Sequence, residues 1–265
     1  MSSSLIIGQY VPGSSIIHRI DPRTKITIVF FFIIFIFLAN SFASYMVILL
    51  FSMISAVLSK IPPSYLIKGL KPVWFLIIFT FLLHILLTRE GDIVFSVANF
   101  HIYSDSLTRG VAISLRFFFL ILMTTLLTLT TSPIAITDAI ESMLNPLRRY
   151  RFPVHELALM MSISLRFIPT LMQETEKISK AQASRGVDFR TGTIRDRLQA
   201  IIPLLVPLFV SAFKRAEELA MAMEARGYQG GEGRTKYRQL LLTPKDYISF
   251  IIFSIFVLSI IVTRN

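Results

Sequence analysis

Residues 26–59 read ITIVFFFIIFIFLANSFASYMVILLFSMISAVLS and contain no charged side chain. A single helix over this stretch would be about 51 Å long, well beyond a hydrocarbon layer of about 30 Å. Asn40 and Ser41 stand near the middle, where two small polar residues favour a turn. The stretch therefore predicts two short membrane-spanning helices, over 25–39 and 42–59.

Three further apolar stretches predict spanning helices along the rest of the chain. They cover residues 72–88, 108–131 and 246–262. The first of them is expected to begin with Pro72 in its first turn, where proline is well tolerated. Between the first two, residues 92–105 alternate in a way that is typical of a small β-hairpin. The expected fold class is an all-α integral membrane protein with about five transmembrane helices.

Composition supports this fold class. Of the 265 residues, 54% are hydrophobic and only 16% are charged, and the mean hydropathy is +0.66. Soluble domains carry about 25% charged residues. The chain has no cysteine, which excludes disulfides, thiolate metal sites and cysteine nucleophiles. The net charge of +11 is better explained by cytoplasmic loops of a membrane protein than by nucleic-acid binding.

The distribution of Lys and Arg predicts the orientation, because these residues accumulate in cytoplasmic loops. The N-terminal segment, the loop 60–71 and the segment 132–245 are basic, whereas the loop 89–109 is not. The N-terminus is therefore expected inside and the C-terminus outside. The predicted division is a membrane domain over 1–131, a cytoplasmic domain over 132–245 and a last span within 246–265. Arg116 lies inside the fourth span, where a charge is functional by default, although a long side chain so near the outer end can also snorkel to the surface.

The cytoplasmic segment predicts a short helix over 134–148 and two long amphipathic helices, over 153–184 and 193–225. The most apolar part of the second, residues 201–213, is interrupted by Pro203 and Pro207. As a helix it would reach only about 20 Å, which is too short for an ordinary span. We expect a packed or interface-lying helix, with a re-entrant segment as the alternative.

Both long helices end in the same way, with Arg-Gly after a small residue. Glycine just past the last turn adopts the left-handed cap conformation readily, and an arginine there complements the helix dipole. Two ordinary caps would explain the pattern. Alternatively, a small residue and an exposed guanidinium at a rigid helix end make a plug for a partner's carboxylate. The candidate docking residues are Ser184, Arg185, Gly186, Ala225, Arg226 and Gly227.

No catalytic centre is expected in this chain. The Gly-rich stretch 230–236 lacks the Gly-Lys-Ser/Thr order of a phosphate-binding loop and is more typical of a linker. The four histidines show no metal-ligand spacing. Energy for any active process would therefore come from a partner.

Several motifs together resemble the transmembrane proteins of energy-coupling factor (ECF) transporters, the EcfT/CbiQ family, over nearly the whole chain. They are Gly8-Gln9-Tyr10, Pro12-Gly13-Ser14, His18-Arg19-Ile20-Asp21-Pro22-Arg23-Thr24-Lys25, Arg166-Phe167-Ile168-Pro169, Ala181-Gln182 before Ser184-Arg185-Gly186, Pro203-Leu204-Leu205, and Ala225-Arg226-Gly227-Tyr228. Ser184 stands where the family more often has alanine, which is equally small. The block from His18 to Lys25 and the paired Arg-Gly endings are specific in combination.

The resemblance implies a multi-pass protein of a bacterial or archaeal cell membrane that takes up vitamins or transition metals. Its partners would be two cytoplasmic ATPases of the EcfA type, either one chain twice or two different chains, and a membrane S-component that binds the substrate. The two long helices would be coupling helices, with Arg185 docked in one ATPase and Arg226 in the other. This chain would bind no cofactor and would not be an enzyme, since ATP and magnesium would be held by the ATPases.

Three other functions are weighed against this one. A conventional ABC permease that lines the substrate path would place polar residues in several spans, which are nearly free of them apart from Arg116 and His84. A membrane-embedded enzyme would show acidic or histidine clusters at the membrane face. A non-transporting membrane adaptor would recruit partners without nucleotide-dependent movement of its helices.

Overall fold

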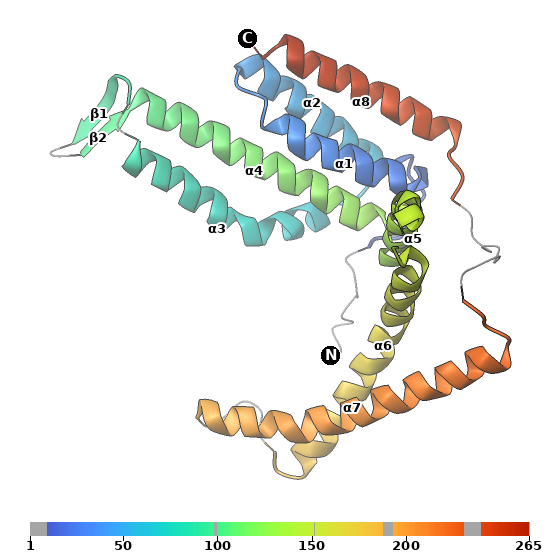
Figure 1. Cartoon of the computed structure of the whole chain (residues 1–265). Coiled ribbons are helices and arrows are strands. Elements are labelled where there is room, and N and C mark those ends of the chain that lie inside the picture. The colour runs from blue at the N-terminus through green and yellow to red at the C-terminus, as the bar shows by residue number, and fades with distance from the viewer. Residues whose placement is uncertain are drawn as a thin grey trace. The chain divides into compact units, whose positions relative to one another are not determined.

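The computed structural model describes residues 10–88, 90–97, 100–150, 152–187, 193–230 and 240–264. In these ranges the chain is helical apart from one β-hairpin (Figure 1). The elements are η1 (Ile17–Arg19), α1 (Pro22–Ile36), α2 (Phe42–Ser59), α3 (Pro63–Leu87), β1 (Ile93–Val97), β2 (Phe100–Tyr103), α4 (Ser104–Thr130), α5 (Pro133–Leu144), η2 (Asn145–Tyr150), α6 (Val154–Ser184), α7 (Ile194–Ala225) and α8 (Pro244–Val262). Gly8, Gln9 and residues 231–236 of the expected linker lie outside the described residues.

Two compact units make up the chain. The first, here called the membrane unit, comprises Met1–Ala139 and Leu240–Asn265; the second, the coupling unit, comprises Ile140–Gln239. The predicted topological division at residues 131 and 245 stays a prediction.

The core of the membrane unit is formed by α1, α2, α4 and α8, which lie side by side in Figure 1. Phe51 and Phe256 stack with ring centroids 4.3 Å apart, and Phe32 lies 5.7 Å from Phe256. Because lipid is as apolar as these side chains, such close packing, rather than removal from water, holds spanning helices together. Phe119, Leu122, Leu126 and Leu129 of α4 complete the cluster of buried residues.

The start of α2 and the β-hairpin agree with the sequence prediction, and a cap also fixes the start of α1. Asp21 caps α1, accepting a bond from the backbone N–H of Arg23 at 2.8 Å, and Pro22 occupies the first helical position. Ser41 caps α2, which confirms the turn expected at Asn40–Ser41. The expected hairpin is also confirmed, with β1 antiparallel to β2 and Ile93 opposite Tyr103.

Helix α3 differs from the prediction, because it begins at Pro63 rather than near residue 72. It bends by 55° between Pro63–Lys71 and Val73–Leu87. Pro72 stands at the bend, and its nitrogen has no hydrogen to donate to the preceding turn. The proline expected to start a span therefore interrupts a longer helix, which packs along α4 (Figure 1).

Arg116 holds the turn between α1 and α2 in place. Its guanidinium donates to the carbonyl oxygen of Ala39 at 2.7 Å and to Asn40 Oδ1 at 3.0 Å, and its Nε donates to the hydroxyl of Tyr45 at 2.9 Å. The carbonyl groups after a helix end need such donors when lipid surrounds them. This intramembrane charge is therefore bound by the fold rather than extended to the surface.

Five helices among the described residues are long and apolar enough to cross a membrane, or six if the bent α3 counts as one span. The predicted fold class is confirmed, but the five differ from those expected. They are α2, α4, α6, Gln199–Ala225 of α7, and α8. With 15 residues, α1 is shorter than an ordinary span, whereas α6 and α7 qualify by length, although they are less apolar than the other three.

In the coupling unit, the predicted helices 153–184 and 193–225 are confirmed almost to the residue as α6 and α7. Figure 1 shows α7 crossing α6, with the C-terminal ends of the two helices well apart. Three prolines lie inside them: Pro169 in α6, and Pro203 and Pro207 in α7.

Candidate functional site

The C-terminal end of α6 is closed by a Schellman motif. The amide of Gly186 donates to the carbonyl oxygen of Ala183 and that of Val187 to Gln182, each at 3.0 Å. Gly186 has φ +87°, a conformation that side chains with a Cβ rarely adopt. The motif satisfies the last carbonyl groups of the helix and fixes Arg185 at its final position.

The end of α7 repeats this geometry. Gly227, with φ +72°, donates to Glu224 at 2.8 Å, and Tyr228 donates to Met223 at 3.0 Å. The predicted left-handed glycine caps are therefore confirmed at both ends. We call residues 184–186 and 225–227 the two tips.

Both tips are open to a partner. Ser184, Arg185 and Gly186 are exposed, as are Ala225, Arg226 and Gly227. A Cβ added at either glycine would meet no atom within 4 Å, so backbone conformation rather than crowding calls for glycine there. Within the part of the chain that the structure describes, neither arginine forms an ion pair. Each tip thus presents a guanidinium, on a rigid support, that can bind a carboxylate through two parallel bonds.

An ion pair and a proline-linked hydrogen bond connect α6 with α7. Arg215 donates to Glu174 at 3.0 Å, and both side chains are partly buried. The side-chain amide of Gln182 donates to the carbonyl oxygen of Pro203 at 3.4 Å. In an ordinary helix this carbonyl would accept from residue 207, but Pro207 has no N–H. A residue just before the first tip therefore bonds to a backbone group that a proline in α7 leaves free.

The polar stretch from His18 to Lys25 fastens neighbouring segments together at one end of the membrane unit. The ring of His18 lies between Ser15 and Val11, with Nδ1 2.7 Å from the Ser15 hydroxyl and Nε2 3.0 Å from the Val11 carbonyl oxygen. Val11 in turn donates its N–H to Leu129 of α4 at 2.9 Å. The N-terminal segment is thereby fastened to the end of α4.

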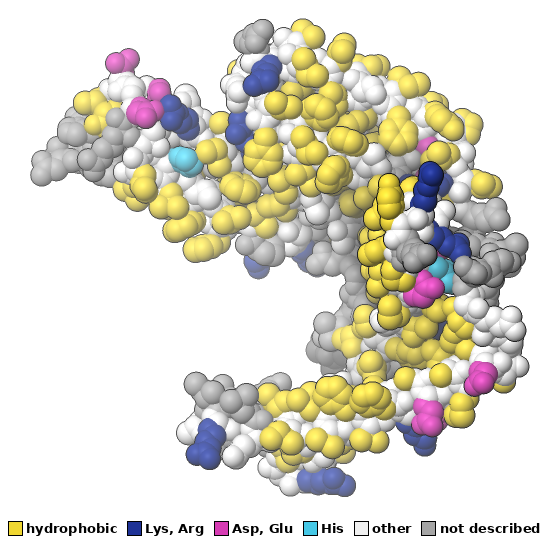
Figure 2. Space-filling model, viewed as in Figure 1, with side chains coloured by type: hydrophobic (Ala, Val, Ile, Leu, Met, Phe, Trp, Pro, Cys, Tyr) yellow, Lys and Arg dark blue, Asp and Glu magenta, His cyan; other side chains and the backbone are white. Residues whose placement is uncertain are grey.

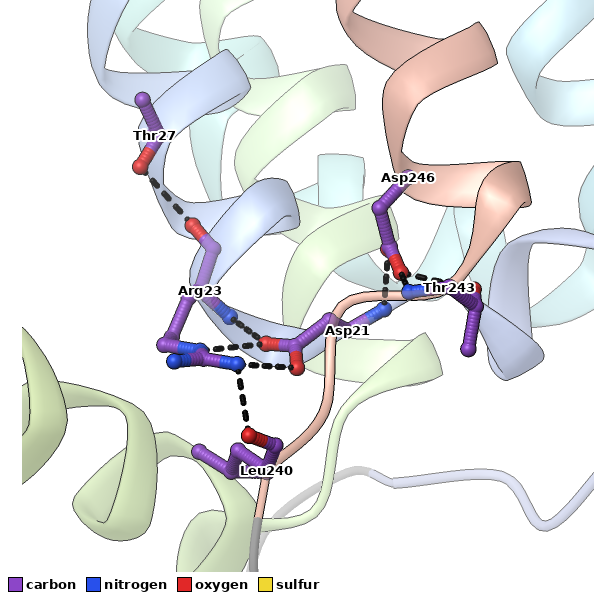
Figure 3. A network of polar contacts seen from close by, with 6 residues as sticks. All are labelled: Asp21, Arg23, Thr27, Leu240, Thr243 and Asp246. Atoms are coloured by element: carbon purple, nitrogen blue, oxygen red, sulfur yellow. Dashed lines mark hydrogen bonds and ion pairs between the residues drawn. The ribbon is translucent and has the colours of Figure 1, made fainter.

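Asp21, Arg23 and Asp246 continue this lock to the start of α8 (Figure 3). Asp246 Oδ1 accepts from the Asp21 N–H at 2.7 Å, and its Oδ2 accepts from the Thr243 N–H and hydroxyl, each at 2.7 Å. Arg23 binds the carboxylate of Asp21 through Nε and Nη2, at 3.1 and 3.0 Å, and donates to the Leu240 carbonyl oxygen at 2.9 Å. Two segments more than 200 positions apart are thus joined.

Lys25 completes the lock at the end of α4. Its side chain is buried, and Nζ donates to the Thr130 carbonyl oxygen at 3.0 Å and to the Thr131 hydroxyl at 3.3 Å. A cation is favoured at this position, because the last carbonyl groups of a helix carry partial negative charge. We call the residues from Ser15 to Lys25, with Thr130, Thr243 and Asp246, the polar lock.

Sequence reasoning found the tips but not the lock. The tips are local patterns of five or six residues, whereas the lock joins three distant segments. One feature of the sequence could have indicated the lock, namely the many polar residues directly before an apolar span. No group of three or more potential metal-binding side chains is found among the described residues.

Comparison with known proteins identifies relatives over the whole architecture. Residues 13–237 match the family described as cobalt transport protein, CbiQ. The chain is 62% identical over 246 residues to the energy-coupling factor transporter transmembrane protein EcfT of Bacillus subtilis, covering 93% of each chain. It is 56% identical to EcfT of Exiguobacterium sibiricum, covering 91% of this chain and 92% of the relative. EcfT of Macrococcus caseolyticus is 51% identical over the full length of both.

Proposed function

The chain belongs to the EcfT/CbiQ family and is a transmembrane component of an energy-coupling factor transporter, and from this premise we propose that it is the coupling subunit. It transmits ATP-driven movement of two cytoplasmic ATPases to a membrane S-component, which binds the vitamin or transition metal. It is a non-catalytic subunit that binds no cofactor itself, and the ATPases hold ATP and magnesium. The observation that carries this proposal is the pair of matching tips with exposed Arg185 and Arg226.

The tips support docking to two separate partners. They end different helices and lie apart in Figure 1, so one small groove cannot hold both. Their surroundings also differ in charge. The last turns of α6 carry Lys177 and Lys180 with one acidic residue, Glu176, which pairs with Lys180. The last turns of α7 carry only acidic charges, at Glu217, Glu218 and Glu224. We propose that each tip enters its own ATPase and that the two docking grooves are not identical.

An apolar stripe on α7 supports contact with an apolar partner. Seven of its side chains are exposed, and Figure 2 shows hydrophobic side chains along this helix. They are Ile201, Ile202, Leu205, Val206, Phe209, Val210 and Phe213. Contiguous exposed apolar surface of this kind marks a site for another protein or for lipid. We propose that the stripe faces the S-component at the membrane surface.

The polar lock supports the proposed orientation. It brings together the start of α1, the end of α4 and the start of α8. The distribution of positive charge assigns all three of these helix ends to the cytoplasm. We propose a bacterial or archaeal cell membrane as the location, with the N-terminus and the coupling helices inside.

Substitution of the tip arginines tests this function. Truncating one side of a buried interfacial charge pair costs about 2–5 kcal/mol. Arg185→Ala and Arg226→Ala should therefore each weaken retention of the ATPases during purification in mild detergent. The double variant should abolish ATP-driven uptake in cells that express the whole transporter. Arg148→Ala, an exposed arginine of η2 remote from the tips in sequence, serves as the matched control.

Normal uptake by the double variant would overturn the proposal. The same experiment separates the alternatives. A conventional permease would lose uptake through substitutions inside its spans, and an adaptor would keep its partners without nucleotide-dependent movement of α6 and α7. Movement of these helices can be followed by a distance between labels placed at the two tips, measured with and without ATP.

A further inference from the structure

A large apolar groove opens among α1, α2, α4 and α8 beside the polar lock. It has a volume of about 430 Å³, and η1 contributes one wall. Its floor is formed by buried side chains, among them Val29, Met123 and Leu126. Its rim is open: Ile54 and Ile252, from α2 and α8, are 50% and 53% exposed.

Such a groove needs an apolar occupant. Its volume lies in the range of about 300–1,000 Å³ that is typical of small-molecule sites. Its walls are mostly apolar, and of the three hydroxyls that line it, Ser55, Thr130 and Ser249, the last two already donate to carbonyl oxygens of their own helices, at 2.7 and 2.8 Å. Close-packed interiors do not leave spaces of this size empty without losing dispersion contacts. In a membrane, the apolar group at hand is an acyl chain.

Positive charge gathers at one end of the groove. Lys25 and Lys245 both line it, and none of its lining residues is acidic. The carboxylate of Asp246, next to Lys245, accepts bonds from Asp21 and Thr243 inside the polar lock and does not line the groove. The groove therefore combines an apolar channel with a cationic end, and the lysine of α8 is exposed.

We propose that this groove binds an anionic phospholipid, with an acyl chain along the apolar channel and the phosphate beside Lys245. Basic pockets between spanning helices are suited to anionic headgroups, and the chain fixes the lipid in the groove. Because α1, α2, α4 and α8 all contribute walls, a bound lipid joins the four helices next to the polar lock. It acts as a structural part of the membrane unit.

The test measures lipid retention by the assembled transporter. The complex is stripped of lipid in mild detergent and titrated with phosphatidylglycerol or with phosphatidylcholine of identical acyl chains, and native mass spectrometry counts the bound lipids. The wild type should retain phosphatidylglycerol preferentially. Lys245→Gln should reduce this preference about fivefold, which is the contribution of one basic residue to binding an anionic headgroup. Lys68→Gln, an exposed lysine of α3 that does not line the groove, is the control.

Filling the groove provides an independent arm. Ile252→Trp occupies the channel and should lower retention about tenfold, because the indole displaces part of the acyl chain and the dispersion contacts that this part makes with the groove. Ile54→Trp places the same bulk in the groove from α2 and keeps the test valid if one variant assembles poorly. Ile251→Trp is the matched control, because Ile251 is 60% exposed and does not line the groove.

Three results would overturn the proposal. Equal retention of the two lipids by the wild type would show that the site does not recognise an anionic headgroup. Unchanged retention in both tryptophan variants would show that the lipid does not bind in the groove. Glycerol phosphate, which has a headgroup but no chain, should not compete with the lipid, and full competition would show that no acyl chain is bound.

Discussion

Asp21, Lys25 and Asp246 are charged residues that are buried at one end of the membrane unit. Burying a charge costs several kcal/mol unless hydrogen bonds and opposite charges compensate for it. Here each residue has several partners, and those partners come from the start of α1, the end of α4 and the segment before α8. The arrangement therefore stabilises one particular packing of these helices, since any other packing would leave the charges without partners.

Asp246→Asn tests this arrangement at a single atom. The carboxylate accepts from three donors, the N–H of Asp21 and the N–H and hydroxyl of Thr243. An amide can keep the first bond but then turns its NH₂ toward the donors of Thr243. A hydrogen bond to a charged acceptor contributes about 1.5–3 kcal/mol, and the two bonds from Thr243 are lost. We expect a lower midpoint of thermal unfolding in mild detergent. Asp92→Asn, at an exposed position, is the control, and equal midpoints for the two variants would contradict the prediction.

Gly227→Ala tests the geometry of the second tip. The left-handed conformation at φ +72° costs about 1–2 kcal/mol for a residue with a Cβ, whereas asparagine tolerates it better. We expect faster amide hydrogen exchange at positions 227 and 228 in the alanine variant, because the bonds from these two amides to Glu224 and Met223 close the helix. Gly227→Asn should lie between alanine and wild type. Identical exchange in all three proteins would show that the cap does not depend on glycine.

These two residue-level sites were not equally predictable. A Schellman cap depends on a few consecutive residues, so Arg226-Gly227 could be interpreted from the sequence alone. Asp246 accepts from a residue 225 positions away, and no local pattern indicates that pairing. The sequence of the lock identified the family without revealing what its polar residues hold together.

At the scale of elements, α6 and α7 are long helices interrupted by prolines that also help to join them. Each internal proline leaves one carbonyl oxygen without its helical donor. At Pro203 this oxygen is used, because Gln182 of α6 donates to it. The bond lies just before Arg185, so it links the first tip to the middle of α7.

A double-substitution cycle tests this connection. Gln182→Met removes the donor and should reduce stability by about 1 kcal/mol. Pro207→Ala restores an N–H that can reach the Pro203 carbonyl within α7, so Gln182→Met should be nearly neutral in that background. Thermal unfolding of the four proteins in mild detergent provides the measurement. The same loss of stability with proline or alanine at 207 would exclude the proposed role of Gln182.

Helix limits were predictable where a capping residue or a proline is compatible with only one structure. They were not predictable where the residue fits both a helix start and a helix interior. Ser41 caps α2 at the expected turn, whereas the last span, expected from residue 246, begins earlier, at Pro244. Pro72 is compatible with a helix start and with a bend inside a helix, and the structure shows the bend, in a helix that packs along α4. The apolar part of α7 is likewise longer than the expected 201–213, because Pro203 and Pro207 lie inside the helix and do not end it.

At the scale of the whole molecule, the number of membrane crossings depends on the coupling unit. Its helices α6 and α7 are long and apolar enough to cross a membrane, although the charges of the segment 132–245 place them inside. If α6 and α7 both crossed the membrane, the chain would pass to the outside along α6 and come back to the cytoplasm along α7. The second tip and the start of α8 would then still lie in the cytoplasm. Only the end of α6 and the start of α7 would move to the outside. The decisive position therefore lies near the first tip.

The absence of cysteine from the sequence makes this position directly testable. Single cysteines at exposed positions can be labelled in intact cells with a maleimide that does not cross membranes. Asp92→Cys and Arg264→Cys should react from outside, whereas Lys60→Cys and Lys180→Cys should react only after the membrane is permeabilised. Lys180 precedes the first tip by about one helical turn, which keeps the label clear of a docked partner. Labelling of Lys180→Cys in intact cells, to the level of Asp92→Cys, would show that α6 spans the membrane and that Arg185 cannot reach a cytoplasmic ATPase.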